Sequence, residues 1–471
     1  MALNSLAYLI LFPIILILYY RLSGRLRIVF LTIISLAFYS LWDIRYTCIL
    51  LLISIATWFS GRFISEKKEN LALCKVILWL NIAAIVGFLL SIRFLPKGSI
   101  IVPIGISFYS LQAIGYISDI YLRRSPSEKS LINYIFFNSF FATVTSGPIQ
   151  RTGCFLKQIG EKKEFDYDRI RRGLYMIAYG LFAKDFVADR LEFIVDKAYA
   201  GYDTETGFIL LIGVVAYAFQ LYCDFMGYSY IALGSALALG FELPDNFRQP
   251  YFSTSVKEFW GRWHISLSEW LRDYLYYPLG GSRKGSLRTI LNICVVFILS
   301  GIWHGKGLTF IIWGSLHGLY RIIEVFSLKK RDVFFGRLSD KSGGKVLKIL
   351  FGIITFILVD FAWLFFRAES ASQAFVMVKR IFTETNLIYS LRNGLYTFGR
   401  SRKELLFWLC GLMIVFVVDV LHEKNIRVAE SLGKKAPAFR WALYFMFIAF
   451  MMGTGMYYYG YSASTFIYSG F

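Results

Sequence analysis

The chain has 471 residues, of which 57% are hydrophobic, 18% aromatic and only 17% charged, and its formal net charge is +20. This composition excludes an ordinary soluble enzyme with one core and predicts an all-α polytopic membrane protein. We expect the positive charge in cytoplasmic loops that face anionic membrane lipid. A nucleic-acid partner is disfavoured because no basic soluble domain carries the charge.

Apolar runs separated by short basic linkers recur from end to end and predict about a dozen membrane segments. The runs are Leu6–Tyr20, Ile28–Leu41, Tyr46–Phe59, Val76–Leu90, Leu131–Val144, Phe208–Leu221, Ile231–Phe241, Ile290–Ile302, Leu308–Ile323, Val346–Phe366, Leu405–Leu421 and Ala442–Tyr459. Several are shorter than the roughly 20 residues that a straight crossing needs, so we expect some to be tilted, re-entrant or broken.

Basic residues after the first and the third apolar run set the expected orientation. They are Arg21, Arg25 and Arg27, and then Arg62, Lys67, Lys68 and Lys75. Short loops rich in Lys and Arg stay in the cytoplasm, so the N-terminus is predicted to lie outside. Met1–Tyr20 has neither a basic leading region nor a small-residue cleavage site, which favours a retained span over a signal peptide.

Two segments are too polar to face lipid. Pro103–Tyr121 mixes aromatic residues with Ser, Gln and Asp at helical spacing and is predicted to face the interior of a helix bundle. Tyr222–Gly234 places Asp224 at membrane depth beside small residues that permit close helix approach. Asp224 is therefore either a buried structural hydrogen-bonding group or part of a functional site.

The segment Asn246–Gly285 combines a histidine with many charges and tryptophans, which is costly in lipid and so indicates chemistry. Ser255 and Glu258 form an S-x-x-E capping box, and aromatic residues follow at steps of three and four. This pattern predicts one amphipathic helix over about Val256–Tyr277, at the membrane interface or on a funnel wall. His264 lies on its inward face, as a packed core residue or as a catalyst.

A second histidine, His304, stands in the segment Ser300–Gly318 among Gly301, Gly305 and Gly307. These glycines favour irregular backbone, which membrane proteins tolerate only where it is buried in protein or lines a wet cavity. We therefore expect His304 to face such a cavity, where a neutral imidazole can take a proton from a hydroxyl. A helix-packing histidine is the alternative. His317 is predicted to be structural, since thirteen residues of continuous helix would place it ~20 Å away.

Several other chemistries lack sequence support. The histidines at 264, 304 and 317 include no H-x-x-x-H pair and no neighbouring carboxylate or thiol, so no metal is predicted. No G-x-S-x-G elbow or nucleotide-binding P-loop is present, and the six scattered cysteines are expected to fill apolar space. No tightly bound cofactor is predicted.

The chain shows no composition shift that marks a second domain. Residues 1–471 are predicted to form one multi-pass domain, with the main motifs in 103–370 and further spans in 371–471. Leu328–Lys345 is basic and punctuated by Gly and Ser, which predicts a flexible cytoplasmic connector. Ala371–Phe382 is expected to be an interfacial amphipathic helix.

An ordered set of motifs resembles the membrane-bound O-acyltransferase family, in the bacterial branch that includes the alginate O-acetylation membrane protein. The motifs are PIGISFYSLQAIGYISDIY (103–121), SGPIQR (146–151), LYCDFMGYSYIALG (221–234), LPDNFRQPYFSTSVKEFWGRWHISLSEWLRDYLYYPLGG (243–281), SGIWHGKGLTFIIWGSLHG (300–318) and AWLFFRAES (362–370). The resemblance implies a ring of roughly a dozen tilted and broken helices around a thin central funnel.

The resemblance also implies residue roles. His304, in the family's WHG motif, is implied as the catalytic base, and His264, in RWHIS, as the second catalytic histidine. Candidate substrate-binding residues are Asp224, Trp303, Arg272 and Asp273. Basic groups near Arg272, Arg283 and Lys284 could hold the phosphates of an acyl donor, or could instead anchor a loop to anionic headgroups.

The implied activity is transfer of a small acyl group through the bacterial inner membrane. The expected co-substrate is acetyl-CoA or another acyl thioester on the cytoplasmic side, and the acceptor is an extracytoplasmic polysaccharide or a periplasmic or surface acyltransferase partner. Two alternatives stay open at this point: D-alanyl transfer to teichoic acid from a carrier protein, and a transporter or flippase that uses the intramembrane ionisable residues as a relay.

Overall fold

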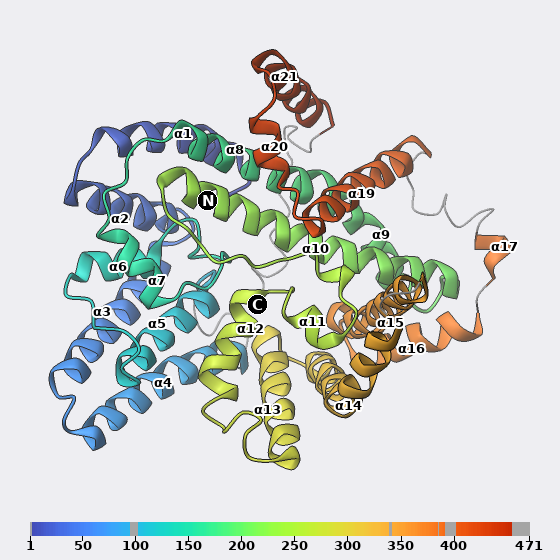
Figure 1. The fold of residues 1–471 in the computed structure, drawn as a ribbon, viewed down its shortest axis with the longest axis horizontal. Helices are drawn as coiled ribbons and strands as arrows, with labels where there is room; N and C mark the ends of the chain where they lie inside the picture. The colour runs from blue at the N-terminus through green and yellow to red at the C-terminus, as the bar shows by residue number, and fades with distance from the viewer. Residues whose placement is uncertain (1, 95–101, 339–341, 385, 391–401, 455–471) are drawn as a thin grey trace. The chain divides into compact units, whose positions relative to one another are not determined.

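The computed structural model describes residues 2–94, 102–338, 342–384, 386–390 and 402–454. These residues form helices and connecting turns and contain no β-strand (Figure 1). They divide into two compact units that interleave along the chain: the described residues within 1–182, 227–245 and 429–471 belong to the first unit, and those within 183–226 and 246–428 to the second. The boundary at 226/227 falls inside one long helix, α10 (Gly207–Leu239).

The first unit contains α1 (Leu6–Arg21), α2 (Arg25–Ser40), α3 (Ile44–Glu66), α4 (Leu71–Phe94), α5 (Ile106–Tyr121), α6 (Leu131–Ser139), α7 (Thr152–Ile159), α8 (Tyr167–Leu181), the C-terminal part of α10, α20 (Val428–Gly433) and α21 (Pro437–Thr454). The second contains the π-helix η1 (Phe182–Ala188), α9 (Asp189–Ala200), the N-terminal part of α10, the 3-10 turn η2 (Pro250–Phe252), α11 (Val256–Trp260), α12 (Ile265–Leu271), the π-helix η3 (Arg272–Tyr276), α13 (Ser286–His304), α14 (Leu308–Leu338), α15 (Ser342–Arg367), α16 (Ala371–Thr383), α17 (Leu387–Tyr389) and α19 (Arg402–Glu423).

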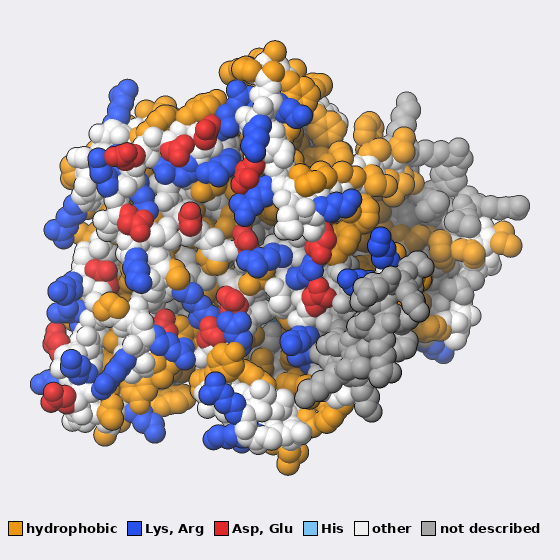
Figure 2. Space-filling model, viewed as in Figure 1, with side chains coloured by type: hydrophobic (Ala, Val, Ile, Leu, Met, Phe, Trp, Pro, Cys, Tyr) orange, Lys and Arg blue, Asp and Glu red, His pale blue; other side chains and the backbone are white. Residues whose placement is uncertain are grey.

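Six helices in the described part of the chain are long and apolar enough to cross a membrane. They lie at Ile44–Glu66, Leu71–Ile92, Gly207–Leu239, Ser286–His304, Gly344–Arg367 and Leu405–Glu423. The expected polytopic all-α membrane protein is confirmed. Figure 2 shows basic and acidic side chains interspersed with hydrophobic ones over one face of the molecule.

Four predicted segments have different boundaries in the structure. Phe208–Leu221 and Ile231–Phe241, predicted as two spans, are one helix, α10, because its glycines serve close packing and do not interrupt the helix. A Cβ at Gly234 would collide with the carbonyl of Gly173 on α8, so both must be glycine for these helices to touch. Leu131–Val144 is helical only to Ser139. The basic stretch predicted as a flexible connector continues α14 to Leu338.

The segment predicted to face a bundle interior does so. In α5 every residue from Ile106 to Ile120 is buried, in the first unit. Its Gln112 donates to Asn138 Oδ1 at 3.4 Å and accepts from the backbone N–H of Gln150 at 3.2 Å. Gln150, from the SGPIQR motif, donates in turn to Thr143 Oγ1 at 2.6 Å. Hydrogen bonding of this kind lets polar side chains stay inside an apolar bundle.

In the second unit, α13 and α14 form a close-packed helical hairpin. A Cβ at Gly301 would overlap the main-chain carbonyl of Phe310, whereas a Cβ at Gly318 would meet Phe297 only at an ordinary 3.5 Å. The short connection Gly305–Gly307 reverses the chain, and Gly307 has φ +122°, a conformation that side chains disfavour.

We therefore expect Gly301→Ala to push α13 away from α14 and to lower stability by about 1–3 kcal/mol, the usual cost of overpacking. The matched variant Gly318→Ala lies on the same hairpin and should be close to neutral. The midpoint of thermal unfolding in detergent would compare the two. Equal midpoints for both variants would contradict the close packing at Gly301.

Candidate functional site

His304 is the last residue of α13, at the point where the glycine-rich connection begins. Its ring is 2% exposed and lies edge-on to three aromatic rings: Trp303 at 4.7 Å, Trp313 at 5.0 Å and Phe366 at 5.3 Å between centroids. The sequence predicted that the helix would be interrupted beside this histidine, and this is confirmed. The water-filled passage next to His304 stays a prediction.

The structure corrects the expected separation of His304 and His317. The two residues lie on different helices, because the chain reverses at Gly305–Gly307, and no continuous helix joins them. Both rings pack against Trp313, with centroid distances of 5.0 Å and 5.1 Å. His317 accepts a hydrogen bond at Nδ1 from the indole N–H of Trp260 at 3.3 Å. This contact fits the predicted structural role.

His264 does not lie within a helix. The predicted single helix over Val256–Tyr277 is wrong: it is broken into α11, α12 and η3, and His264 is the N-cap of α12, with a left-handed backbone at φ +42°. Ser255 caps α11 as predicted, accepting from the N–H of Glu258 at 3.1 Å.

The break occurs because the chain around His264 pairs with the preceding loop. The backbone N–H of Ile265 donates to Asn246 at 3.0 Å, and that of Arg248 donates to Arg262 at 3.0 Å. The four residues between α11 and α12 are therefore not helical. Helical periodicity in the sequence does not reveal this short antiparallel pairing. His264 is 1% exposed, and burial lowers its pKa to about 3, so the imidazole is neutral at pH 7.

Trp303 brings the two motif histidines into one site. Its ring centroid lies 4.7 Å from that of His304 and 6.2 Å from that of His264, and the His264 ring also contacts Phe225 at 4.6 Å. Of the six predicted site residues, His264, Trp303 and His304 therefore lie together within the second unit. Two imidazoles beside an indole can accept, donate and orient a proton.

Asp224 is held in a buried three-membered ion cluster. Lys184 Nζ lies 2.5 Å from Asp224 Oδ1 and 2.7 Å from Asp189 Oδ1, and all three side chains are at most 3% exposed. Burial opposes the charge of Lys184, but the two carboxylates outweigh this effect and hold the pKa of Lys184 above its usual value. This geometry supports the structural interpretation of Asp224, and its substrate-binding role stays a prediction.

Arg272 and Asp273 lie in the π-helix η3 and pair with each other. Arg272 Nε donates to Asp273 Oδ1 at 2.9 Å, and Nη2 lies 3.5 Å from Glu269. Both side chains are partly exposed, at 46% and 25%. Their predicted contact with substrate is not tested by this geometry. π-Helical turns are rare and occur often at functional sites.

Sequence reasoning missed three residues that organise the site. Lys184 and Asp189 were not singled out, although a lysine within an apolar stretch signals a buried partner. The third is Arg262, which contacts Glu258 and Glu423. Among the described residues, no group of three His, Cys, Asp or Glu side chains is placed to hold a metal ion.

Two buried histidines next to one tryptophan, at an interrupted helix in a bundle of apolar helices, place groups that can accept and donate a proton in one site. The chain belongs to the membrane-bound O-acyltransferase family, whose sequence pattern matches residues 28–359. It is therefore an O-acyltransferase. Membership of this family favours the enzyme over the transporter or flippase alternative.

Curated relatives carry related activities. The chain is 35% identical to a probable alginate O-acetylase of Pseudomonas fluorescens, over 81% of this chain and 76% of the relative. It is 32% identical to a peptidoglycan O-acetyltransferase of Helicobacter pylori, over 74% and 72% of the two chains. It is 28% identical to a teichoic acid D-alanyltransferase of Bacillus subtilis, over 58% and 71%.

Proposed function

We propose that this protein O-acetylates an extracytoplasmic polysaccharide, with a cytoplasmic acyl thioester, acetyl-CoA, as donor. The observation that carries the proposal is the shared contact of His264 and His304 with Trp303. The likeness to an alginate O-acetylase and a peptidoglycan O-acetyltransferase supports acetyl as the group and a polysaccharide as the acceptor class. We place the protein in the bacterial inner membrane, with its N-terminus outside.

The chemistry requires one base and an oriented hydroxyl. His304 takes the proton of the acceptor hydroxyl while the hydroxyl oxygen attacks the carbonyl carbon of the thioester. The tetrahedral intermediate collapses and the C–S bond breaks. The leaving thiolate takes the proton back from His304, so the products are the ester and the free thiol, and His304 is neutral again. His264 stays neutral at pH 7 and orients the reacting groups beside Trp303. The acceptor is the polysaccharide itself or a separate outer transferase that passes the acetyl group on.

One alternative activity has a specific basis. The similarity to a teichoic acid D-alanyltransferase is the basis for this alternative, D-alanyl transfer. Its donor would be a carrier protein that bears a thioester. The donor distinguishes the two activities, because the carrier must dock at the cytoplasmic mouth whereas acetyl-CoA diffuses freely. The shared coverage is smaller for this relative than for the O-acetylating ones, so we favour acetyl transfer.

The test is a donor competition in membranes that contain the full-length chain. With radiolabelled acetyl-CoA we expect label in the extracted surface polymer that mild alkali releases, as an ester would. With a D-alanyl-charged carrier protein we expect none. Label from the charged carrier alone would establish the alternative, and label from neither donor, with folded protein, would overturn the proposed function.

A further inference from the structure

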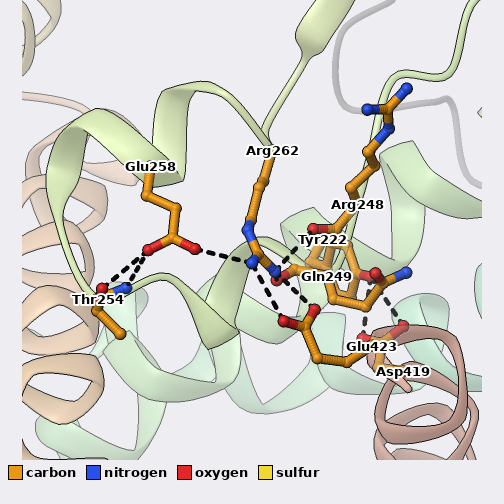
Figure 3. Close-up of polar contacts among 8 residues, drawn as sticks. All are labelled: Tyr222, Arg248, Gln249, Thr254, Glu258, Arg262, Asp419 and Glu423. Carbon is orange, nitrogen blue, oxygen red and sulfur yellow. Dashed lines mark hydrogen bonds and ion pairs between the residues drawn. The ribbon is translucent and has the colours of Figure 1, made fainter. Parts of the chain in front are cut away.

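The turn that carries His264 is held by an arginine that binds two carboxylates. Arg262 Nη2 lies 2.7 Å from Glu258 Oε1 on α11. The same guanidinium donates to both carboxylate oxygens of Glu423, the last residue of α19, at 2.7 Å and 3.1 Å (Figure 3). A bidentate pair of this kind fixes direction as well as charge, because the guanidinium is planar.

The backbone that Arg262 stabilises is in an unfavourable conformation. Among the described residues, four that are not glycine have positive φ, and two of them, Gln249 at +43° and His264 at +42°, lie on the two paired segments next to Arg262. Such conformations persist only where surrounding contacts over-determine them. Arg262 supplies part of that constraint, since Nη1 donates to the carbonyl of Gln249 at 3.4 Å.

α19 makes a second polar contact with the same region. The Tyr222 hydroxyl donates to both carboxylate oxygens of Asp419, at 3.0 Å and 3.2 Å. The Tyr222 ring also packs near that of Trp263, the residue before His264, with centroids 6.2 Å apart. Asp419 and Glu423 are four residues apart, so one face of α19 makes both contacts (Figure 3). α19 lies beyond residues 28–359, which carry the family match.

We propose that α19 is a positioning element for acyl transfer and that Arg262 is the residue through which it holds His264. The proposal rests on the proposed function, because it assigns a role to the orientation of His264. Arg262 and Glu423 are 22% and 38% exposed, and ion pairs of such exposure contribute little to stability. The pair therefore acts mainly on the rate of transfer, through the geometry of the turn.

The test measures rate and stability separately in the full-length protein, with radiolabelled acetyl-CoA as the probe. For Arg262→Gln we expect kcat to fall about tenfold or more, because small misplacements of reacting groups are costly, with KM for acetyl-CoA unchanged. Arg262→Lys should recover part of the rate, since it keeps the charge. Glu423→Gln should lose less, because Glu258 still binds the guanidinium.

The double variant Arg262→Gln/Glu423→Gln should be no slower than Arg262→Gln alone. Both substitutions remove the same contact, the ion pair between Arg262 and Glu423, so their effects should not add. The control is Arg62→Gln, which removes an exposed ion pair with Glu66 on α3. Wild-type rates in Arg262→Gln, an additive loss in the double variant, or a thermal midpoint that falls with the rate would overturn the positioning role. A folded wild type that transfers no acetyl group would overturn the proposed function instead.

Discussion

Acetyl transfer is expected to be lost in His304→Ala while the protein still folds. The imidazole is the proposed base, and removal of a general base costs about a hundredfold or more in rate. The ring is nearly fully buried among Trp303, Trp313 and Phe366, so the variant leaves an apolar-walled gap and exposes no charge. The measurement is ester-linked label from radiolabelled acetyl-CoA, together with size-exclusion elution and thermal midpoint of the purified protein.

The matched control is His317→Gln, because His317 packs against the same Trp313 ring, one turn further along α14. Its Nδ1 accepts from Trp260, so the expected loss is in stability, with transfer retained. His304→Gln completes the set as a variant that keeps a polar side chain at the site. Retained transfer in both His304 variants would remove His304 from the mechanism.

Lys184→Met is expected to produce the largest loss of stability. The substitution leaves Asp189 and Asp224 buried without their cation, and removing one partner of a buried ion pair costs about 3–5 kcal/mol. Asp224→Asn should cost less, because the pair of Lys184 with Asp189 remains. The measurement is the free energy of unfolding, or the thermal midpoint, in detergent micelles.

The control is Lys197→Met on α9, a half-buried lysine, for which a change within about 0.5 kcal/mol is expected. A stable Lys184→Met protein would contradict the structural importance of the cluster. The Asp224→Asn variant also tests the predicted substrate-binding role: loss of transfer at unchanged stability would favour that role, and loss of both would favour the structural one.

The sequence predicted those features that depend on local pattern. Apolar runs and basic linkers indicated the membrane helices, and the glycines around His304 indicated the interruption after α13, because glycine acts on the backbone where it stands. The polar residues of Pro103–Tyr121 indicated a buried helix, since hydrocarbon does not tolerate them. Motif order indicated the family, and the match over residues 28–359 confirmed it.

Features that depend on partners distant in sequence were not predictable in the same way. The periodicity over Val256–Tyr277 favours a continuous helix. Pairing with Asn246–Arg248 breaks this helix and leaves His264 at the N-cap of α12 with a left-handed backbone. Spacing within one helix placed His317 far from His304, whereas a chain reversal brings both to Trp313.

By itself, the sequence determined that this protein is an all-α membrane O-acyltransferase and which histidines belong to its characteristic motifs. Only the tertiary structure decided that His264, Trp303 and His304 adjoin, that Lys184 neutralises Asp224, and that the end of α19 contacts Arg262. The physical reason is that hydrophobic periodicity reports one element at a time. Ion pairs, ring contacts and helix breaks are set by side chains that meet only after the helices have packed.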